Sequence, residues 1–283
     1  MSDVAIGRAG VDDVRSVLRR RKFDEASLGI ALRSAERGTA WVARDDGEII
    51  GVALAQSTEG ERYVGECFVE PSYRGHGIAG KLLDAAFADA DANRAMVLDP
   101  GDFAGLALAL RHGIVPRATV VRVAGSIPRE ESLMRMAAGD YRFAVDAIDP
   151  AGHAFGLDAL DRETRGTTRP SDHEYFARNA TGQAFFLNGE FVAYAYVWPD
   201  GRIGPLAASS TAYLVQIFGF VLVTLQRSHG ASWCTALIPT GNTRLAKTAL
   251  RAGLRIEETL TLAGDATAIP DLSCYAGFHR LLF

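Results

Sequence analysis

Residues 69–83 read Val69-Glu70-Pro71-Ser72-Tyr73-Arg74-Gly75-His76-Gly77-Ile78-Ala79-Gly80-Lys81-Leu82-Leu83. This stretch is the most informative one for the fold and for the candidate site. An apolar strand pattern ends at its first residue, a glycine-rich turn follows, and apolar residues at helical spacing begin at Ile78. Gly75 and Gly77 let the backbone approach a ligand closely, and a helix start supplies N–H groups without intrahelical partners. Arg74 and Lys81 add positive charge. The stretch therefore suits a pyrophosphate, with an ordinary glycine turn that caps a helix as the alternative.

The same stretch resembles the fingerprint of the GNAT superfamily of acyl-CoA-dependent N-acyltransferases, Arg/Gln-x-x-Gly-x-Gly/Ala after a strand that often ends in Val-x-Pro. The order of helices, strands and hairpin over roughly residues 1–125 also looks like that family. The resemblance implies that the turn binds the pyrophosphate of coenzyme A. It further implies that the pantetheine arm lies where the strand ending at Val69 separates from the strand at 95–98. The residues that it assigns to cofactor binding are Phe68, Val69, Arg74, Gly75, His76, Gly77, Ile78, Ala79, Gly80 and Lys81.

Acyl transfer to an amine needs groups that move protons. An alkyl amine is mostly protonated at neutral pH, so a base or a water chain has to take its proton. By the resemblance, Glu66 is the candidate base; the alternative is a structural or charge-matching glutamate. Relatives often carry a tyrosine acid where this chain has Ala109, so Tyr73 or Tyr63 is a candidate substitute, each otherwise a packing residue. Asp102 is expected to cap the next helix.

A weak internal repeat with an offset near 140 residues indicates two copies of one domain, with chance similarity as the alternative. The matched pairs are the hairpin turns Asp46-Gly47 and Asn188-Gly189, the helix ends Leu110–Ile114 and Leu250–Leu254, and Asp102 and Asn242. We therefore predict an α/β (α+β) protein of two GNAT-like domains, each a mixed, largely antiparallel sheet flanked by helices. Residues 1–128 form the N-terminal GNAT domain with the acetyl-CoA site, and residues 129–283 the degenerate C-terminal copy.

The second copy departs from the fingerprint. Aligning Gly65 with Gly204 places residues 213–219, Tyr-Leu-Val-Gln-Ile-Phe-Gly, where Arg74–Gly80 stands. The two close-approach glycines become Leu214 and Gln216, so this copy is expected to cradle a pyrophosphate poorly. Residues 201–208 and 157–162 nevertheless resemble the C-terminal domain of bacterial tandem-GNAT proteins of the YitH-like type, which implies a domain that packs on the first.

Composition excludes several classes of protein. A net charge of −4 argues against a general nucleic-acid binder, and three distant cysteines argue against a disulfide scaffold or a cysteine-rich zinc site. The N-terminus has no signal-peptide pattern, and the longest apolar run, 212–225, predicts a buried helix and not a membrane span. We expect a cytoplasmic, bacterial protein that binds no metal, nucleic acid or membrane; self-association stays open.

Three other features favour structural interpretations. Asp172-His173-Glu174 is expected to be a solvated polar loop and not a metal site. Tyr194 and Tyr196 share one strand face and are expected in the core or an interface. The run 19–22, Arg-Arg-Arg-Lys, is expected to be a solvated helix end, with an anion site as the alternative.

The function expected from these residues is N-acetylation: an amine attacks the thioester of acetyl-CoA directly. The alternative is a non-catalytic acyl-CoA-binding sensor or scaffold, which the missing tyrosine and the degenerate second copy motivate. The acceptor amine and the acyl length are not determined by the sequence.

Overall fold

The chain folds as two compact units, and its C-terminal part returns twice to the first. The computed structural model describes residues 4–21, 23–58, 60–88, 93–265 and 269–283. Unit 1 comprises Met1–Arg117, Leu262–Ala268 and His279–Phe283, and unit 2 comprises Ala118–Thr261 and Ile269–Phe278. The first boundary between the units lies between Arg117 and Ala118. The domain boundary after residue 128 is inferred from the internal repeat in the sequence and stays a prediction.

Unit 1 is a sheet in the order β1-β2-β3-β4-β5-β12, antiparallel from β1 to β4 and parallel between β4 and β5. Helix α3 packs on one face of this sheet through a core that includes Leu82, Leu83, Val64 and Val69. The elements are β1 (Ala5–Arg8), α1 (Val11–Arg20), α2 (Glu25–Glu36), β2 (Ala40–Asp45), β3 (Glu48–Thr58), β4 (Glu61–Val69), a 3-10 turn (Pro71–Tyr73), α3 (Ile78–Phe87), β5 (Asn93–Leu98) and α4 (Phe103–Arg111). The predicted end of α3 at Ala92 lies outside the described residues.

Strands β4 and β5 pair over only part of their length. The register runs from Glu61 opposite Asn93 to Val64 opposite Met96, whereas β4 continues to Val69. On its other side β4 carries a bulge, because Leu54 pairs with Glu66 and the next residue of β3 pairs with Val64. A bulge re-aims the strand and ends regular pairing. The two strands therefore separate at the carboxyl end of β4, directly before the glycine turn.

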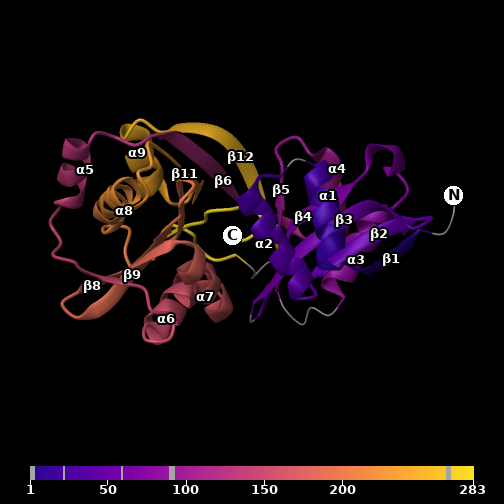
Figure 1. Ribbon diagram of the computed structural model, residues 1–283, viewed down its shortest axis with the longest axis horizontal. Helices are drawn as coiled ribbons and strands as arrows, with labels where there is room; N and C mark the ends of the chain where they lie inside the picture. Colours follow the sequence, from indigo (N-terminus) through magenta and orange to yellow (C-terminus); the bar gives the residue numbers. More distant parts are fainter. Residues whose placement is uncertain (1–3, 22, 59, 89–92, 266–268) are drawn as a thin grey trace. The chain divides into compact units, whose positions relative to one another are not determined.

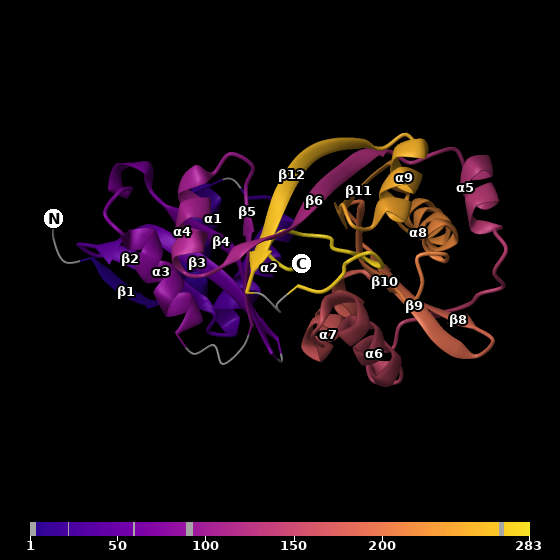
Figure 2. The same ribbon diagram turned by 180° about the vertical axis from the view of Figure 1, so that it is seen from behind.

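Unit 2 repeats this plan in the order β12-β6-β11-β10-β9-β8-β7, with β13 beside β10. In Figures 1 and 2, α8 and α9 lie on one side of β9, β10 and β11, and α6 and α7 on the other. The elements are β6 (Val115–Ser126), α5 (Glu130–Ala137), β7 (Ala144–Ala147), α6 (Ala154–Arg165), α7 (Pro170–Asn179), β8 (Thr181–Leu187), β9 (Glu190–Val197), β10 (Arg202–Ala208), α8 (Leu214–His229), β11 (Trp233–Pro239), α9 (Thr243–Arg251), β12 (Arg255–Gly264) and β13 (Tyr275–Ala276).

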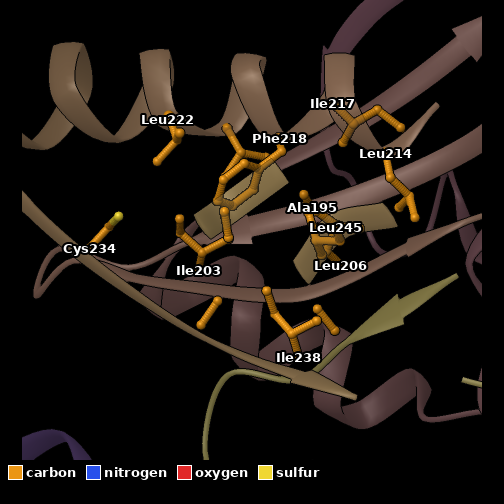
Figure 3. Close-up of a cluster of buried hydrophobic side chains, with 14 of the residues drawn as sticks. Ala195, Ile203, Leu206, Leu214, Ile217, Phe218, Leu222, Cys234, Ile238 and Leu245 are labelled. Carbon is orange, nitrogen blue, oxygen red and sulfur yellow. The ribbon is translucent and has the colours of Figure 1, made fainter. Parts of the chain in front are cut away.

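The apolar run predicted as a buried helix is α8. Its residues Ile217, Phe218 and Leu222 are fully buried. Figure 3 shows them pointing at Ile203 of β10 and Ile238 of β11. Burial of such side chains is worth roughly 1.5–3 kcal/mol each, so α8 anchors the core of unit 2.

The equivalent positions of the predicted repeat adopt equivalent backbone conformations. Both hairpin turns are left-handed at two successive residues, with φ of 46° and 84° at Asp46-Gly47 and 53° and 84° at Asn188-Gly189. Asp102 caps α4 by accepting from the N–H of Gly105, and Asn242 caps α9 in the same way. The predicted fold class is confirmed.

Candidate functional site

The glycine turn before α3 is open to solvent. Arg74, Gly75, His76 and Gly77 are all exposed. Gly75 and Gly77 are left-handed, with φ of 83° and 76°, and a Cβ built on either meets nothing within 4 Å. A side chain at these positions would occupy the space in front of the backbone N–H groups. The turn therefore has the bare backbone that a pyrophosphate requires.

Helix α3 begins without a side-chain cap. Its N-cap is Gly77, and among the described residues no side chain accepts from the first turn of α3. The N–H groups of Ile78, Ala79 and Gly80 precede the first full helical turn, so they have no intrahelical acceptor. The Nε of Arg74 donates to the carbonyl of Val69 at 3.0 Å, which ties the turn to the end of β4. This helix start fits an anionic ligand.

Glu66 lies on the face of β4 opposite α3. Its side chain is 9% exposed and accepts from Nη1 of Arg21 at 2.7 Å. The guanidinium of Arg21 also lies 4.0 Å from the ring of Phe68, which directs this ring to the same face of the sheet. Arg21 follows α1, so the run 19–22 is not merely a solvated helix end; Lys22 lies outside the described residues.

Residues 279–283 also pack against this face of β4. A Cβ on Gly65 would lie 2.6 Å from Cα of Leu281, so only glycine fits there without a shift. The hydroxyl of Tyr63 donates to the carbonyl of Arg280 at 2.5 Å, and the Arg280 guanidinium pairs with Asp99 after β5, at 2.7 and 3.2 Å. The segment therefore contributes to the region where β4 and β5 separate.

The tyrosines are engaged elsewhere. Tyr73 packs at the edge of the core on the α3 side of the sheet, away from Glu66. Burial, together with the charge and hydrogen bond of Asp45, raises the pKa of Tyr73. Ala109, at the position of the tyrosine found in relatives, is fully buried. The structure does not bring the two candidate catalytic residues, Glu66 and Tyr73, together.

The corresponding turn of unit 2 is covered. Residue Tyr213 is helical and leads directly into α8, without left-handed glycines. The side chain of Gln216 exchanges hydrogen bonds with the backbone of Tyr141, at 2.7 and 3.1 Å, and a Cβ on Gly219 would meet the backbone of Ala137 at 2.6 Å. Packed chain thus occupies the place that the open turn has in unit 1.

Strand β13 closes the gap between β10 and β11. Only Arg202 and Ile203 pair with β11 in parallel register, and beyond them Leu206 and Ala207 of β10 pair with β13. Gly277 exchanges backbone hydrogen bonds with Leu237 of β11 at 2.9 and 3.2 Å. These bonds fill the gap, in agreement with the prediction of a degenerate second copy.

The Asp172-His173-Glu174 prediction of a solvated loop is wrong. These residues lie on α7, and Asp172 and His173 are each only 1% exposed. Nε2 of His173 bonds to the carboxylate of Asp161 at 3.0 Å, and Nδ1 bonds to the hydroxyl of Tyr196 at 3.0 Å. The His173 imidazole can be buried because Asp161 and Tyr196 satisfy both of its ring nitrogens.

Asp161 is the centre of this buried cluster. Its carboxylate also pairs with the fully buried Arg169, at 3.3 Å from Nε, and accepts a short hydrogen bond from Tyr194. Burial opposes ionisation of Asp161, but the charge of Arg169 and the bond from His173 outweigh it and hold the pKa below its usual range. Tyr194 and Tyr196 are thus core residues, as predicted.

Sequence reasoning did not identify Arg21, Arg280 or Asp99 as part of the site. Asp99 and Arg280 are separated by 181 residues, and Arg21 and Glu66 by 45. Neither pair forms a local motif, so only the fold could reveal it. Within the described ranges there is no cluster of three or more potential metal ligands, and no helix long and apolar enough to cross a membrane.

Comparisons with known proteins identify the domain type. A family model for the acetyltransferase (GNAT) domain matches residues 36–110. No curated protein matches the chain. Among solved structures, a provisionally assigned acetyltransferase from Pyrococcus horikoshii is 15% identical with a TM-score of 0.73, covering 100% of this chain and 97% of that one.

Two further structures also match over nearly their whole length. A tandem GNAT protein from the clavulanic acid biosynthesis pathway is 14% identical (TM-score 0.59), with 95% of this chain and 100% of that chain covered. A GCN5-related N-acetyltransferase from Sphaerobacter thermophilus is 16% identical (TM-score 0.60), with 96% and 98% covered. Residues 36–110 therefore belong to a GNAT acetyltransferase domain, and the chain as a whole has the fold of a tandem GNAT protein.

Proposed function

We propose that unit 1 is an N-acetyltransferase that moves an acetyl group from acetyl-CoA to an amine, and that unit 2 binds no acyl-CoA. The observation that carries this proposal is the exposed, left-handed turn at Gly75 and Gly77, followed by an uncapped helix and preceded by a strand that separates from its neighbour. The matching turn and gap of unit 2 are filled.

In this proposal the residues of the turn bind the pyrophosphate. The N–H groups from Gly75 to Gly80 and the dipole of α3 supply the attraction, and Arg74 and Lys81 add charge. His76, Ile78 and Ala79 belong to the same turn, and Phe68 and Val69 flank the pantetheine arm as it passes between β4 and β5. Acetyl-CoA supplies the activated acyl group as a thioester.

The residues on the face of β4 opposite α3 are proposed to bind and deprotonate the acceptor amine. Glu66 is the proposed base, taking a proton from the amine directly or through water. Arg21, at 2.7 Å, fixes the position of this carboxylate, and its stacking on Phe68 fixes the guanidinium in turn. Holding amine and thioester together supplies much of the acceleration. Tyr73 has no proposed part in proton transfer, because Asp45 engages its hydroxyl.

The test is a Gly77→Gln variant measured by calorimetric binding of CoA and by thiol release from acetyl-CoA with a panel of amines. The new side chain lies in the open space over the helix start, so CoA affinity should fall at least about 100-fold while the protein stays folded. Gly189→Gln is the matched control, since Gly189 is also left-handed (φ 84°) with nothing within 4 Å of a Cβ. It should bind CoA as the wild type does.

Two outcomes would redirect the proposal. Unchanged CoA affinity in Gly77→Gln would move the site away from α3. Tight CoA binding without thiol release for any amine would favour an acyl-CoA sensor. The buried Ala109 is compatible with that outcome, because it stands where relatives often carry a tyrosine acid.

A further inference from the structure

We propose that Arg280 stabilises the thiolate that leaves when the acyl group is transferred. This inference rests on the proposed function, because it assumes that the thioester emerges between β4 and β5 on the face that carries Glu66. Arg280 comes from residues 279–283, which belong to unit 1 although they follow all of unit 2 in the sequence.

The position of Arg280 is fixed by contacts on both strands. Tyr63 of β4 donates to its carbonyl at 2.5 Å, and Leu281 lies directly over Gly65. Asp99, after β5, accepts from both Nη atoms at 2.7 and 3.2 Å, in a bidentate geometry. The backbone at Arg280 and Leu281 therefore lies against β4, while the Arg280 guanidinium is held at the residue that directly follows β5.

Neighbouring residues anchor the same segment. The Nδ1 of His279 lies 3.1 Å from the N–H of Leu281 and accepts from it, and its Nε2 lies 2.8 Å from the hydroxyl of Ser27 on α2. The side chains of Leu281 and Leu282 are buried. A cation carried by this segment is preorganised, because its backbone does not have to order when substrate arrives.

The guanidinium is accessible but only partly paired. Its side chain is 26% exposed, against 49% for Asp99, so water screens the carboxylate more than the cation. Within the part of the chain that the structure describes, the buried Nε of Arg280 has no hydrogen-bond partner. Burial lowers the pKa of Arg280, but Asp99 and the charge of Glu66 outweigh it and raise the pKa, so the charge persists at any physiological pH.

Neither Tyr63 nor Tyr73 serves this purpose. The hydroxyl of Tyr63 is donated to Arg280, that of Tyr73 is engaged by Asp45, and Ala109 replaces a tyrosine. The other charged groups near Arg280 are Glu66, which is paired with Arg21, and Asp99. Arg280 is therefore a cation beside the end of β5 whose partner, Asp99, is more exposed than the cation itself.

The acyl transfer replaces the carbon–sulfur bond of the thioester by a carbon–nitrogen bond. The amine nitrogen forms a bond to the carbonyl carbon, the carbon–sulfur bond breaks, and its electron pair goes to sulfur. The amine loses its proton to Glu66 or water. The thiolate remains as an anion beside Arg280 and later takes a proton from water. Arg280 neither gives nor accepts a proton.

The experiment measures the pKa of the CoA thiol in the complex, from the ultraviolet absorbance of the thiolate between pH 6 and about 9.5, with the desulfo-CoA complex as the blank. Free CoA titrated in the same way is the reference, and an opposite charge within about 4–6 Å lowers the pKa of a thiol by about one to three pH units. Protein cysteines do not interfere, because burial raises the pKa of Cys67 and of Cys234 to about 12 and also raises that of Cys274.

We expect the bound thiol to titrate at least about one pH unit below the free thiol in the wild type, and Arg280→Gln to abolish this lowering, a tenfold or larger change in the acid constant. Arg280→Lys should retain part of it. Arg94→Gln is the matched control: Arg94 also pairs with an aspartate at 2.8 Å and is 31% exposed, but its partner is Asp265. It should leave the thiol unchanged.

A second variant keeps the proposal testable if Arg280→Gln fails to fold. Asp99→Asn keeps the cation and removes its counter-charge, so the thiol should titrate lower than in the wild type. If neither Arg280→Gln nor Asp99→Asn moves the thiol pKa while CoA still binds, the role of Arg280 is refuted and the proposed function stands. If the wild type binds no CoA, the proposed function itself fails.

Discussion

Replacing Asp161 by Asn should destabilise unit 2 severely, because it removes the only negative charge facing Arg169 in the described cluster. Both side chains are 0% exposed. The carboxylate accepts from Arg169, His173 and Tyr194. Asn has the same shape, but its NH₂ group is a donor that would face other donors.

The magnitude follows from this geometry. Breaking a buried ion pair by removing one partner costs about 3–5 kcal/mol, since the remaining charge is left uncompensated. Nη1 of Arg169 already has no partner within the described residues, so no spare hydrogen bond offsets the loss. For a domain of roughly 150–250 residues, 1 kcal/mol shifts the melting temperature by about 2–4 °C, which gives a decrease of about 6–20 °C.

The assay is urea and thermal unfolding followed by tryptophan fluorescence and circular dichroism. Trp198 packs against Phe278 in unit 2, with ring centroids 4.6 Å apart, and reports on this unit. Glu174→Gln is the matched control on α7: its partner Arg178 is 75% exposed and Glu174 59%, so the cost should stay below about 1 kcal/mol. The double variant Asp161→Asn/Arg169→Met should regain stability relative to Asp161→Asn. A cost below about 1 kcal/mol for Asp161→Asn would show that the buried charge of Arg169 does not depend on Asp161.

Gly65→Ala should lower the free energy of unfolding of unit 1 by about 1–3 kcal/mol, because its Cβ would lie 2.6 Å from Cα of Leu281; urea unfolding checks this, and an unchanged midpoint would show that residues 279–283 do not pack on β4. Acidification should also destabilise unit 1. Burial raises the pKa of Asp265, but Arg94 outweighs it and leaves the pKa below the ordinary 3.8, so this stabilisation is complete above about pH 5 and is lost as the pH falls through the folded-state pKa. The urea midpoint should therefore be the same at pH 7 and pH 5 as far as this pair contributes and lower at pH 3, with a smaller decrease at pH 3 in Arg94→Gln; equal decreases in the two proteins would exclude this pair as a contributor.

Local features of the fold could be predicted from the sequence. The turn at Gly75 and Gly77, the hairpins at Asp46-Gly47 and Asn188-Gly189, and the caps Asp102 and Asn242 all lie where their residues indicate. Each depends on contacts within about four residues, and few residue types satisfy a left-handed backbone or an exposed helix start. The same kind of local argument predicts that the second copy lacks an open turn, because Leu214 and Gln216 stand in place of the two glycines.

Contacts between segments far apart in the sequence depend on the tertiary structure alone. An Asp-His-Glu triplet has the same local sequence in a loop and in a core, and its His173 is buried here because Asp161 and Tyr196, from other elements, bond to both ring nitrogens. Arg280 reaches Asp99 across 181 residues because the chain returns to unit 1 after β13. Such pairs leave no periodic or local signal, since their partners are chosen by the path of the whole chain.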